Sequence, residues 1–177
     1  MKKGYTLIEI LVAVAIFFTV VSIPTSFFIL SLKSQGKVLG LREIIDNSSY
    51  ALEYTSRVLR MAKKDDLEGV NCLSGDKVNY EITHSGQGIK FKNYKDECQE
   101  FYLEGGQIKE QKGGNIIPLT SDNLEITSLT FKISGQEQED GLQPRATILF
   151  EIQKKGQPAT KIRLQTTVSQ RNLDVTY

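Results

Sequence analysis

The stretch Tyr5–Leu32, YTLIEILVAVAIFFTVVSIPTSFFILSL, decides the fold of this chain. It is almost wholly apolar, and Glu9 is the one charged residue in it. A helix needs about 20 such residues to cross the hydrocarbon core of a bilayer, and this run is longer. A lone carboxylate inside a membrane-spanning segment costs free energy, so its presence indicates a function.

The residues in front of the run set its orientation. Lys2 and Lys3 precede it, and the positive-inside rule then leaves the N-terminus in the cytoplasm and sends the C-terminal body outward. A cleaved secretory signal has a shorter apolar core, of about 7–15 residues, and a small-residue cleavage site behind it. No such site follows here. An uncleaved signal anchor accounts for the length and the lysines, but it leaves Glu9 unexplained.

The segment Lys3-Gly4-Tyr5-Thr6-Leu7-Ile8-Glu9 resembles the class III signal of type IV pilins and type II secretion pseudopilins. In that family a membrane aspartyl protease, the prepilin peptidase, cuts after the glycine and methylates the new N-terminal residue. The resemblance therefore implies cleavage between Gly4 and Tyr5 and N-methylation of Tyr5. The family usually has phenylalanine after the glycine. Tyr5 keeps the aromatic ring and adds a hydroxyl, so we expect processing to persist.

Cleavage would also give Glu9 a partner. Removal of the leader, residues 1–4, creates a cationic amine on Tyr5 at the edge of the apolar layer. Glu9 lies four residues on and can neutralise that amine in the same subunit or in a neighbour, which removes the cost of an unpaired charge. We expect it to set the register of side-by-side packing, as one buried polar residue does in a coiled coil. In the family this glutamate supports subunit assembly. The alternative is a side chain that merely extends to the membrane interface.

After Leu32 the sequence becomes amphipathic, which predicts that the helix continues over residues 33–64. We expect residues 5–32 to form the transmembrane and filament-core half, and the helix to fade near Lys63–Asp66. The predicted core-facing positions recur at three-, four- and seven-residue steps: Val38, Leu41, Ile45, Leu52, Thr55, Leu59 and Ala62.

From about Lys77 the hydrophobic period changes to two, which is typical of β-strands. Short alternating stretches are separated by glycine-containing turns, and a break in alternation at Thr127-Ser128 predicts a β-bulge. Residues 65–177 are therefore expected to form a globular antiparallel β domain. The predicted fold class is α+β and pilin-like: a long N-terminal helix, transmembrane in its first half, packed on a C-terminal antiparallel sheet.

Two further segments resemble stretches of minor pilins: Pro118–Ile126, running into Leu129–Phe131, and Leu164–Asn172. Together with the N-terminus they imply a minor pilin or pseudopilin, a structural subunit of a bacterial type IV pilus or type II secretion-like filament. The implied location is the inner membrane, which the chain crosses once before it enters an extracytoplasmic filament. The implied partners are other pilin subunits, the prepilin peptidase and an inner-membrane assembly platform. The alternatives are a signal-anchored extracytoplasmic binding domain and a DNA-binding minor pilin of an uptake pilus.

The DNA-binding alternative has one candidate stretch. Lys90, Lys92 and Lys95 lie near Phe91 and Tyr94, and lysines interleaved with aromatic residues can bind single-stranded nucleic acid. An edge strand protected by lysines accounts for the same pattern, and we favour it. The formal net charge of +1 gives no general preference for nucleic acid.

Candidates for chemistry are few. The two cysteines, Cys72 and Cys98, are a disulfide candidate outside the cytoplasm, although spacing alone does not show whether they come within reach. The one histidine, His84, falls in a predicted turn, and the acidic pairs Asp65-Asp66 and Glu137–Asp140 lack the spacing of a calcium loop. No phosphate loop or hydrolase motif occurs. We therefore expect no catalytic residues, no metal, no cofactor and no enzymatic activity.

Overall fold

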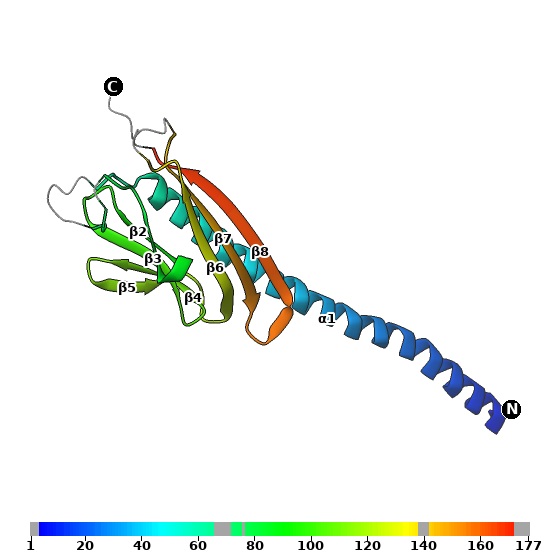
Figure 1. Ribbon diagram of the computed structural model, residues 1–177. Coiled ribbons are helices and arrows are strands. Elements are labelled where there is room, and N and C mark those ends of the chain that lie inside the picture. The colour runs from blue at the N-terminus through cyan, green and yellow to red at the C-terminus, as the bar shows by residue number, and fades with distance from the viewer. Residues whose placement is uncertain (1–3, 66–71, 76, 138–141, 172–177) are drawn as a thin grey trace. The chain divides into compact units, whose positions relative to one another are not determined.

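A computed structural model describes residues 4–65, 72–75, 77–137 and 142–171, and its contacts divide the chain into two compact units, Met1–Leu41 and Arg42–Tyr177. A helix comes first and strands follow (Figure 1). The elements are α1 (Leu7–Arg60), β1 (Glu81–Thr83), the short 3-10 helix η1 (His84–Gly86), β2 (Gly88–Lys92), β3 (Cys98–Glu104), β4 (Gln107–Lys112), β5 (Asn115–Pro118), β6 (Leu124–Ser134), β7 (Arg145–Lys154) and β8 (Gln157–Ser169). The predicted α+β class with a long N-terminal helix is confirmed. Leader residues 1–3, Asp66 and residues 138–140 of the acidic loop lie outside the described residues.

Helix α1 ends earlier than the sequence predicts, at Arg60 rather than near Lys63. The residues that follow leave the helix because their backbone groups pair with Lys92 of β2 and with Val78, just before β1. The Lys63 amide donates to the Lys92 carbonyl at 2.9 Å, and the Asp65 amide donates to the Val78 carbonyl at 2.9 Å. These pairings satisfy backbone groups that a longer helix would have satisfied internally.

The buried face of the second half of α1 agrees with the prediction at Thr55 and Leu59, which are buried, but differs from it nearer the N-terminus. Ile44 is fully buried, whereas the predicted Ile45 is 52% exposed. Leu41 and Val38, also predicted to face a core, are exposed as well. The buried positions in this half recur every three or four residues: Ile44, Ser48, Ala51, Thr55 and Leu59. Ala62, just beyond the end of α1, is also buried as predicted. The prediction was wrong at Val38, Leu41 and Ile45 because it followed large apolar side chains, whereas small residues such as Ser48 and Ala51 occupy part of the buried face.

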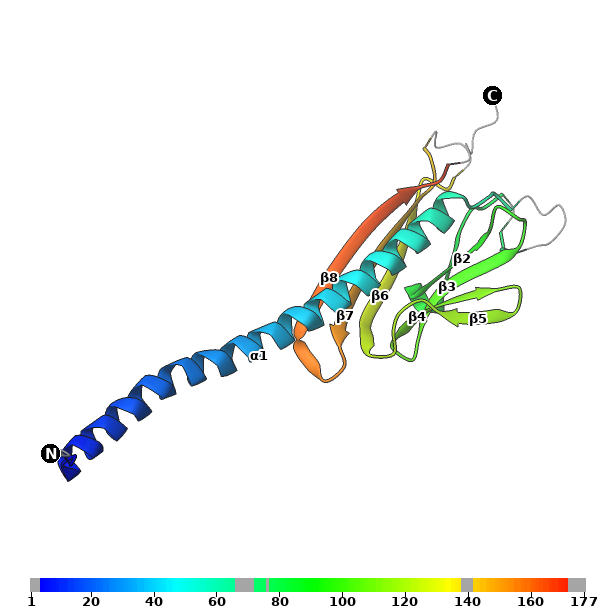
Figure 2. The ribbon, with the colours of Figure 1, turned by 180° about the vertical axis from the view of Figure 1, so that it is seen from behind.

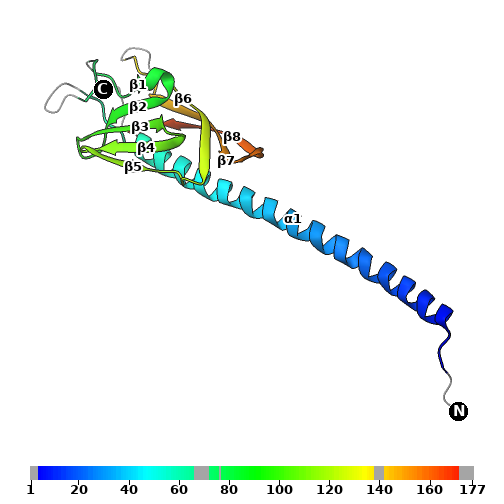
Figure 3. The ribbon, with the colours of Figure 1, turned by 90° about the horizontal axis from the view of Figure 1, so that it is seen from below.

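The strands form two antiparallel sheets. One has the order β1-β2-β3-β4-β5 (Figure 3) and the other the order β6-β7-β8. Consecutive strands pair throughout each sheet, as expected for hairpins with short turns. The predicted bulge is confirmed, because the register between β6 and β7 shifts between Ile126 and Ser128.

One core joins both sheets to the second half of α1. Figure 2 shows this part of the helix in front of β6–β8, with β2–β5 beside it. Ile44 and Leu59 of α1 pack in the same buried cluster as Phe101 of the first sheet and Phe150 of the second. Polar contacts also fix the helix end, since the Tyr80 hydroxyl donates to the Leu59 carbonyl at 2.7 Å.

Candidate functional site

The N-terminus of α1 is closed by a capping box. The Glu9 carboxylate accepts hydrogen bonds from the Thr6 backbone amide and the Thr6 hydroxyl, both at 3.0 Å. In return the Thr6 hydroxyl accepts from the Glu9 amide at 3.4 Å. This reciprocal pair is the Thr-x-x-Glu arrangement that satisfies the otherwise unpaired donors of a helix start. This capping role of Glu9 was not predicted, although the spacing of Thr6 and Glu9 is typical of a capping box.

Glu9 also lies on the same side of the helix as Tyr5. The two residues line one open hollow with Ile10, Ala13, Val14 and Phe17. Tyr5 is 83% exposed, and the space around Gly4 is open, with no atom within 4 Å of where a Cβ would stand. The predicted processing residues are therefore accessible, and the predicted assembly residue lines the same hollow as Tyr5.

The first half of α1 is an exposed apolar surface. Its most apolar stretch of 18 residues has a mean hydropathy of 2.5, and none of it is buried. By length and composition this helix can cross a membrane. Water would meet large side chains along its whole length, including Phe17, Phe18, Phe27 and Phe28, so this half requires an apolar environment outside its own chain.

Polar side chains inside this half are adapted to such an environment. The hydroxyls of Thr19, Ser22, Thr25 and Ser26 each donate to the backbone carbonyl four residues earlier, at 2.6–3.0 Å. A hydroxyl with an internal partner can be placed in an apolar layer at little cost. These four residues therefore do not oppose burial of the helix.

Comparison with known proteins agrees with this geometry. Residues 1–23 match the family model described as a prokaryotic N-terminal methylation motif. The chain thus carries a class III prepilin signal, consistent with a type IV pilin or pseudopilin. The motif implies processing by a prepilin peptidase and assembly with other pilin subunits, and with the apolar helix it indicates a membrane-anchored bacterial protein. No curated protein and no solved structure matches the chain.

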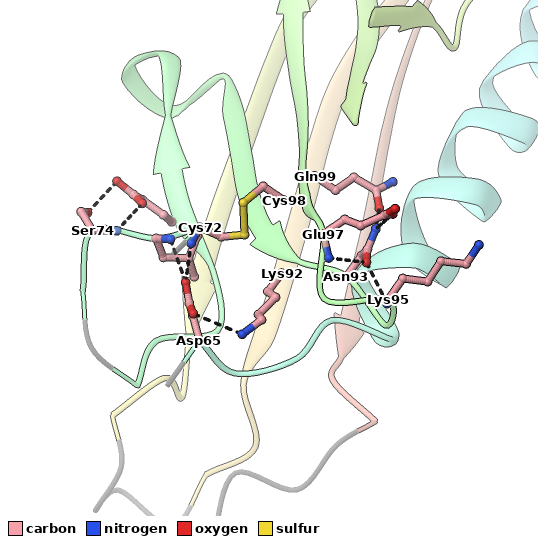
Figure 4. The surroundings of a disulfide bond; sticks show 11 residues. Asp65, Cys72, Ser74, Lys92, Asn93, Lys95, Glu97, Cys98 and Gln99 are labelled. Atoms are coloured by element: carbon pink, nitrogen blue, oxygen red, sulfur yellow. Dashed lines mark hydrogen bonds and ion pairs between the residues drawn. A yellow bond between two sulfur atoms is a disulfide. The ribbon is translucent and has the colours of Figure 1, made fainter. Parts of the chain in front are cut away.

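The globular body carries the predicted cysteine pair. Cys72 and Cys98 are joined by a disulfide, with Cα atoms 5.2 Å apart (Figure 4). The bond ties the segment Cys72–Gly75 to the start of β3. It thereby closes a loop of 26 residues, which reduces the conformational freedom of the unfolded chain.

Beside the disulfide lies a buried ion pair. Asp65 is fully buried, and one of its oxygens accepts from the amides of Cys72 and Leu73 at 2.7 and 2.9 Å. The other oxygen lies 3.6 Å from the Lys92 ammonium, whose side chain is 6% exposed. The Asp65 carboxylate therefore connects three parts of the chain: the segment that follows α1, the disulfide-bonded segment at Cys72, and β2 (Figure 4).

This arrangement corrects the sequence interpretation of β2. Phe91 is fully buried and Lys92 is 5% exposed, so neither side chain presents itself to a nucleic acid. Nor is β2 an edge strand, because it lies between β1 and β3. The lysine at 92 neutralises Asp65 instead of protecting an edge.

His84 is partly exposed, as expected of a turn residue, but it makes defined contacts. Its ring stacks on Tyr102 with centroids 4.6 Å apart, and its Nε2 lies 3.2 Å from a carboxylate oxygen of Glu100. The close approach needs Gly88, where a Cβ would stand 2.8 Å from the His84 ring. Among the residues the structure describes, no group of three or more potential ligands could hold a metal ion.

Proposed function

We propose that the chain is a minor pilin or pseudopilin, a non-enzymatic structural subunit of a type IV pilus or type II secretion-like filament. One observation carries the proposal: the methylation motif at residues 1–23 overlaps the start of helix α1 (Leu7–Arg60), whose first half exposes apolar side chains. That half would span the inner membrane once before assembly and would then pack among neighbouring helices in the filament. The minor type is supported by the two segments resembling minor pilins. The first runs from β5 into β6, and Leu164–Ser169 of the second lies in β8, whereas its last residue, Asn172, lies outside the described residues.

In this proposal the leader acts as a switch. Before cleavage, Lys2 and Lys3 hold the orientation of the helix in the membrane. Hydrolysis of the Gly4–Tyr5 peptide bond then removes both lysines and leaves an amine on Tyr5. Glu9 lines the same hollow as Tyr5, and its carboxylate can neutralise this amine. Burial of the apolar half among neighbours would drive association, and repetition of such a non-closing contact generates a filament.

Intact-mass analysis of the full chain, extracted from membranes of cells with an active prepilin peptidase, tests the proposal. We expect a chain that begins at N-methylated Tyr5. Recovery of an intact chain that still begins at Met1 would contradict the proposal and favour a signal-anchored binding domain. A correctly processed chain that binds DNA with strong salt dependence would instead favour a DNA-uptake pilin.

Replacing Glu9 by glutamine separates its two roles. Glutamine also completes a capping box, so the helix start is retained, whereas the charge that meets the Tyr5 amine is lost. We expect Glu9→Gln to be processed normally and to enter filaments at least about tenfold less, since about 1.4 kcal/mol corresponds to a factor of ten. Quantification of the variant in sheared filaments against total cell protein measures this.

The matched control is Glu53→Gln, which removes an exposed carboxylate from the same helix where it pairs with Arg57. We expect this variant to assemble like the unmodified chain. Equal incorporation of Glu9→Gln and Glu53→Gln would show that Glu9 caps the helix and has no role in register.

A further inference from the structure

A second carboxylate, Glu110 on β4, is buried without a cationic partner among the residues that the structure describes. It is 6% exposed, and its oxygens accept hydrogen bonds from the Tyr54 hydroxyl at 2.9 and 3.0 Å and from the Gln99 side-chain amide. Both donors are neutral. The Gln99 side chain is an amide, and burial, with a smaller effect of the nearby Glu110 carboxylate, raises the pKa of the Tyr54 hydroxyl to about 12. A buried carboxylate with neutral partners alone carries an uncompensated charge.

Glu110 faces a cavity of about 460 Å³. The cavity is lined by Tyr54, Glu97, Glu110, Lys112, Gly113, Asn115 and Ile117. Two of the lining side chains are carboxylates and one is an ammonium, and that ammonium, on Lys112, lies 3.2 Å from the Glu97 carboxylate. The lining therefore has one negative charge in excess, and this charge is on Glu110.

Two exposed side chains, one stacked on a lining residue and one in the lining itself, have surfaces that a long cationic side chain prefers. Tyr50, which is 58% exposed, stacks on Tyr54 with ring centroids 6.1 Å apart. Ile117 on β5 is 55% exposed. Aromatic faces attract ammonium and guanidinium groups, and the aliphatic stems of lysine and arginine pack on apolar side chains.

We propose that this cavity receives a lysine or arginine side chain from a neighbouring pilin-like subunit, a proposal that rests on the proposed function. The incoming cation neutralises Glu110, and its stem packs between Ile117 and the tyrosines. The cavity opens beside β5, the last strand of its sheet. Pro118 in β5 lacks an amide donor, which limits continuous strand pairing along this edge, so the side-chain pocket supplies the recognition.

The first test is a titration of the full chain in detergent micelles, followed by the NMR signals of the Gln99 side-chain amide and the Tyr54 ring. The probe is Nα-acetyl-arginine methylamide, and the control probe is the neutral isostere Nα-acetyl-citrulline methylamide. We expect saturable shifts with the arginine derivative and none with citrulline. Equal shifts with both probes, or no saturable shift with either, would overturn the proposal.

The second test fills the cavity from within. Ile117 lies directly opposite Glu110 in the register of β4 and β5, so in Ile117→Lys the new ammonium can reach the carboxylate. We expect this variant to lose the arginine-dependent shifts and to unfold at a higher temperature. The matched control is Ile116→Lys on the neighbouring residue, which is 53% exposed and opposite Gln111, and whose side chain points to the other face of the sheet. It should retain both the shifts and the original midpoint. Retained shifts in Ile117→Lys would contradict the proposed cavity.

Filament assembly identifies the source of the cation. Both variants should be processed after Gly4, but Ile117→Lys should be depleted from filaments while Ile116→Lys is not. If the probe binds and the two variants assemble equally, the assignment to a neighbouring subunit is wrong. If the unmodified chain retains its leader, the proposed function fails, whereas the titration still reports on the cavity because it needs no filament.

Discussion

Gly4→Val is expected to leave the four-residue leader on nearly all of the protein. Glycine before the cut lets the backbone approach the peptidase closely, and a β-branched side chain at this position would stand between the scissile bond and the enzyme. Intact-mass analysis of membrane-extracted protein measures the fraction that still begins at Met1. Because the lysines would remain and the Tyr5 amine would not form, the variant should also be absent from filaments.

Gly36→Val is the matched control. Like Gly4, Gly36 has open space around the position of a Cβ, so neither substitution creates a clash within the chain. We expect normal cleavage of Gly36→Val, since this residue lies far along α1 from the cut. Normal cleavage of Gly4→Val as well would show that the peptidase tolerates a side chain at position 4 and would remove the stated role of this glycine.

Asp65→Asn is expected to be the most destabilising of the substitutions in the globular body. The amide can still accept hydrogen bonds, but the buried Lys92 ammonium loses the carboxylate that neutralises it. Breaking a buried pair by removing one partner costs about 3 kcal/mol or more. For a chain of this size that lowers the thermal midpoint by roughly 6–12 °C. Circular dichroism of the full chain in detergent follows this change.

The exposed pair of Lys63 and Asp96 provides the control. Its atoms approach to 2.8 Å, but the side chains are 37% and 58% exposed, and solvent screens such pairs. We expect Asp96→Asn to leave the midpoint nearly unchanged. In the Asp65→Asn background, Lys92→Met should recover part of the loss by removing the buried ammonium that the Asp65 carboxylate neutralises. A midpoint of Asp65→Asn equal to that of Asp96→Asn would show that the buried pair is not a determinant of stability.

The same carboxylate predicts a dependence on acid. Burial alone would raise the pKa of Asp65, but the amides of Leu73 and Cys72 and the charge of Lys92 outweigh it and hold the pKa below 3.8. A carboxyl whose pKa is lower in the folded than in the unfolded state contributes its full stabilisation at pH values above the unfolded-state pKa. That contribution is lost as the pH falls from the unfolded-state pKa to the folded-state pKa. The difference in midpoint between the unmodified chain and Asp65→Asn should therefore be constant at neutral pH and shrink below about pH 4. A difference that persists unchanged at lower pH would contradict this assignment.

Local sequence patterns were sufficient to predict the N-terminal segment. The motif ending in Glu9, the apolar run and the lysines are contiguous, so one reading of the chain identifies the signal and the helix that follows. The hairpins and the bulge at Thr127-Ser128 were likewise predicted, because alternation and turn residues report on strands without knowledge of distant neighbours. The capping role of Glu9 was within reach of the same local reasoning and was overlooked.

Contacts between distant segments decided the rest. The buried face of α1 was misplaced by one position at Ile45 because the sheets accept small residues such as Ser48 and Ala51, which hydropathy does not mark as core. Lys92 looked like a surface residue until the chain after α1 brought Asp65 beside it. Cys72 and Cys98 were a candidate pair, but their 5.2 Å separation comes from packing and not from spacing.

By itself, then, the sequence determined the signal, the long helix and the α+β class, because each depends on residues close together in the chain. The tertiary structure alone decided which helix face is buried, which lysine is neutralised inside the body, and that Glu110 has no cation among the described residues. These properties depend on the distance between side chains that are far apart in sequence. The free energy of burying a charge or an apolar group is set by the side chains that surround it in the fold.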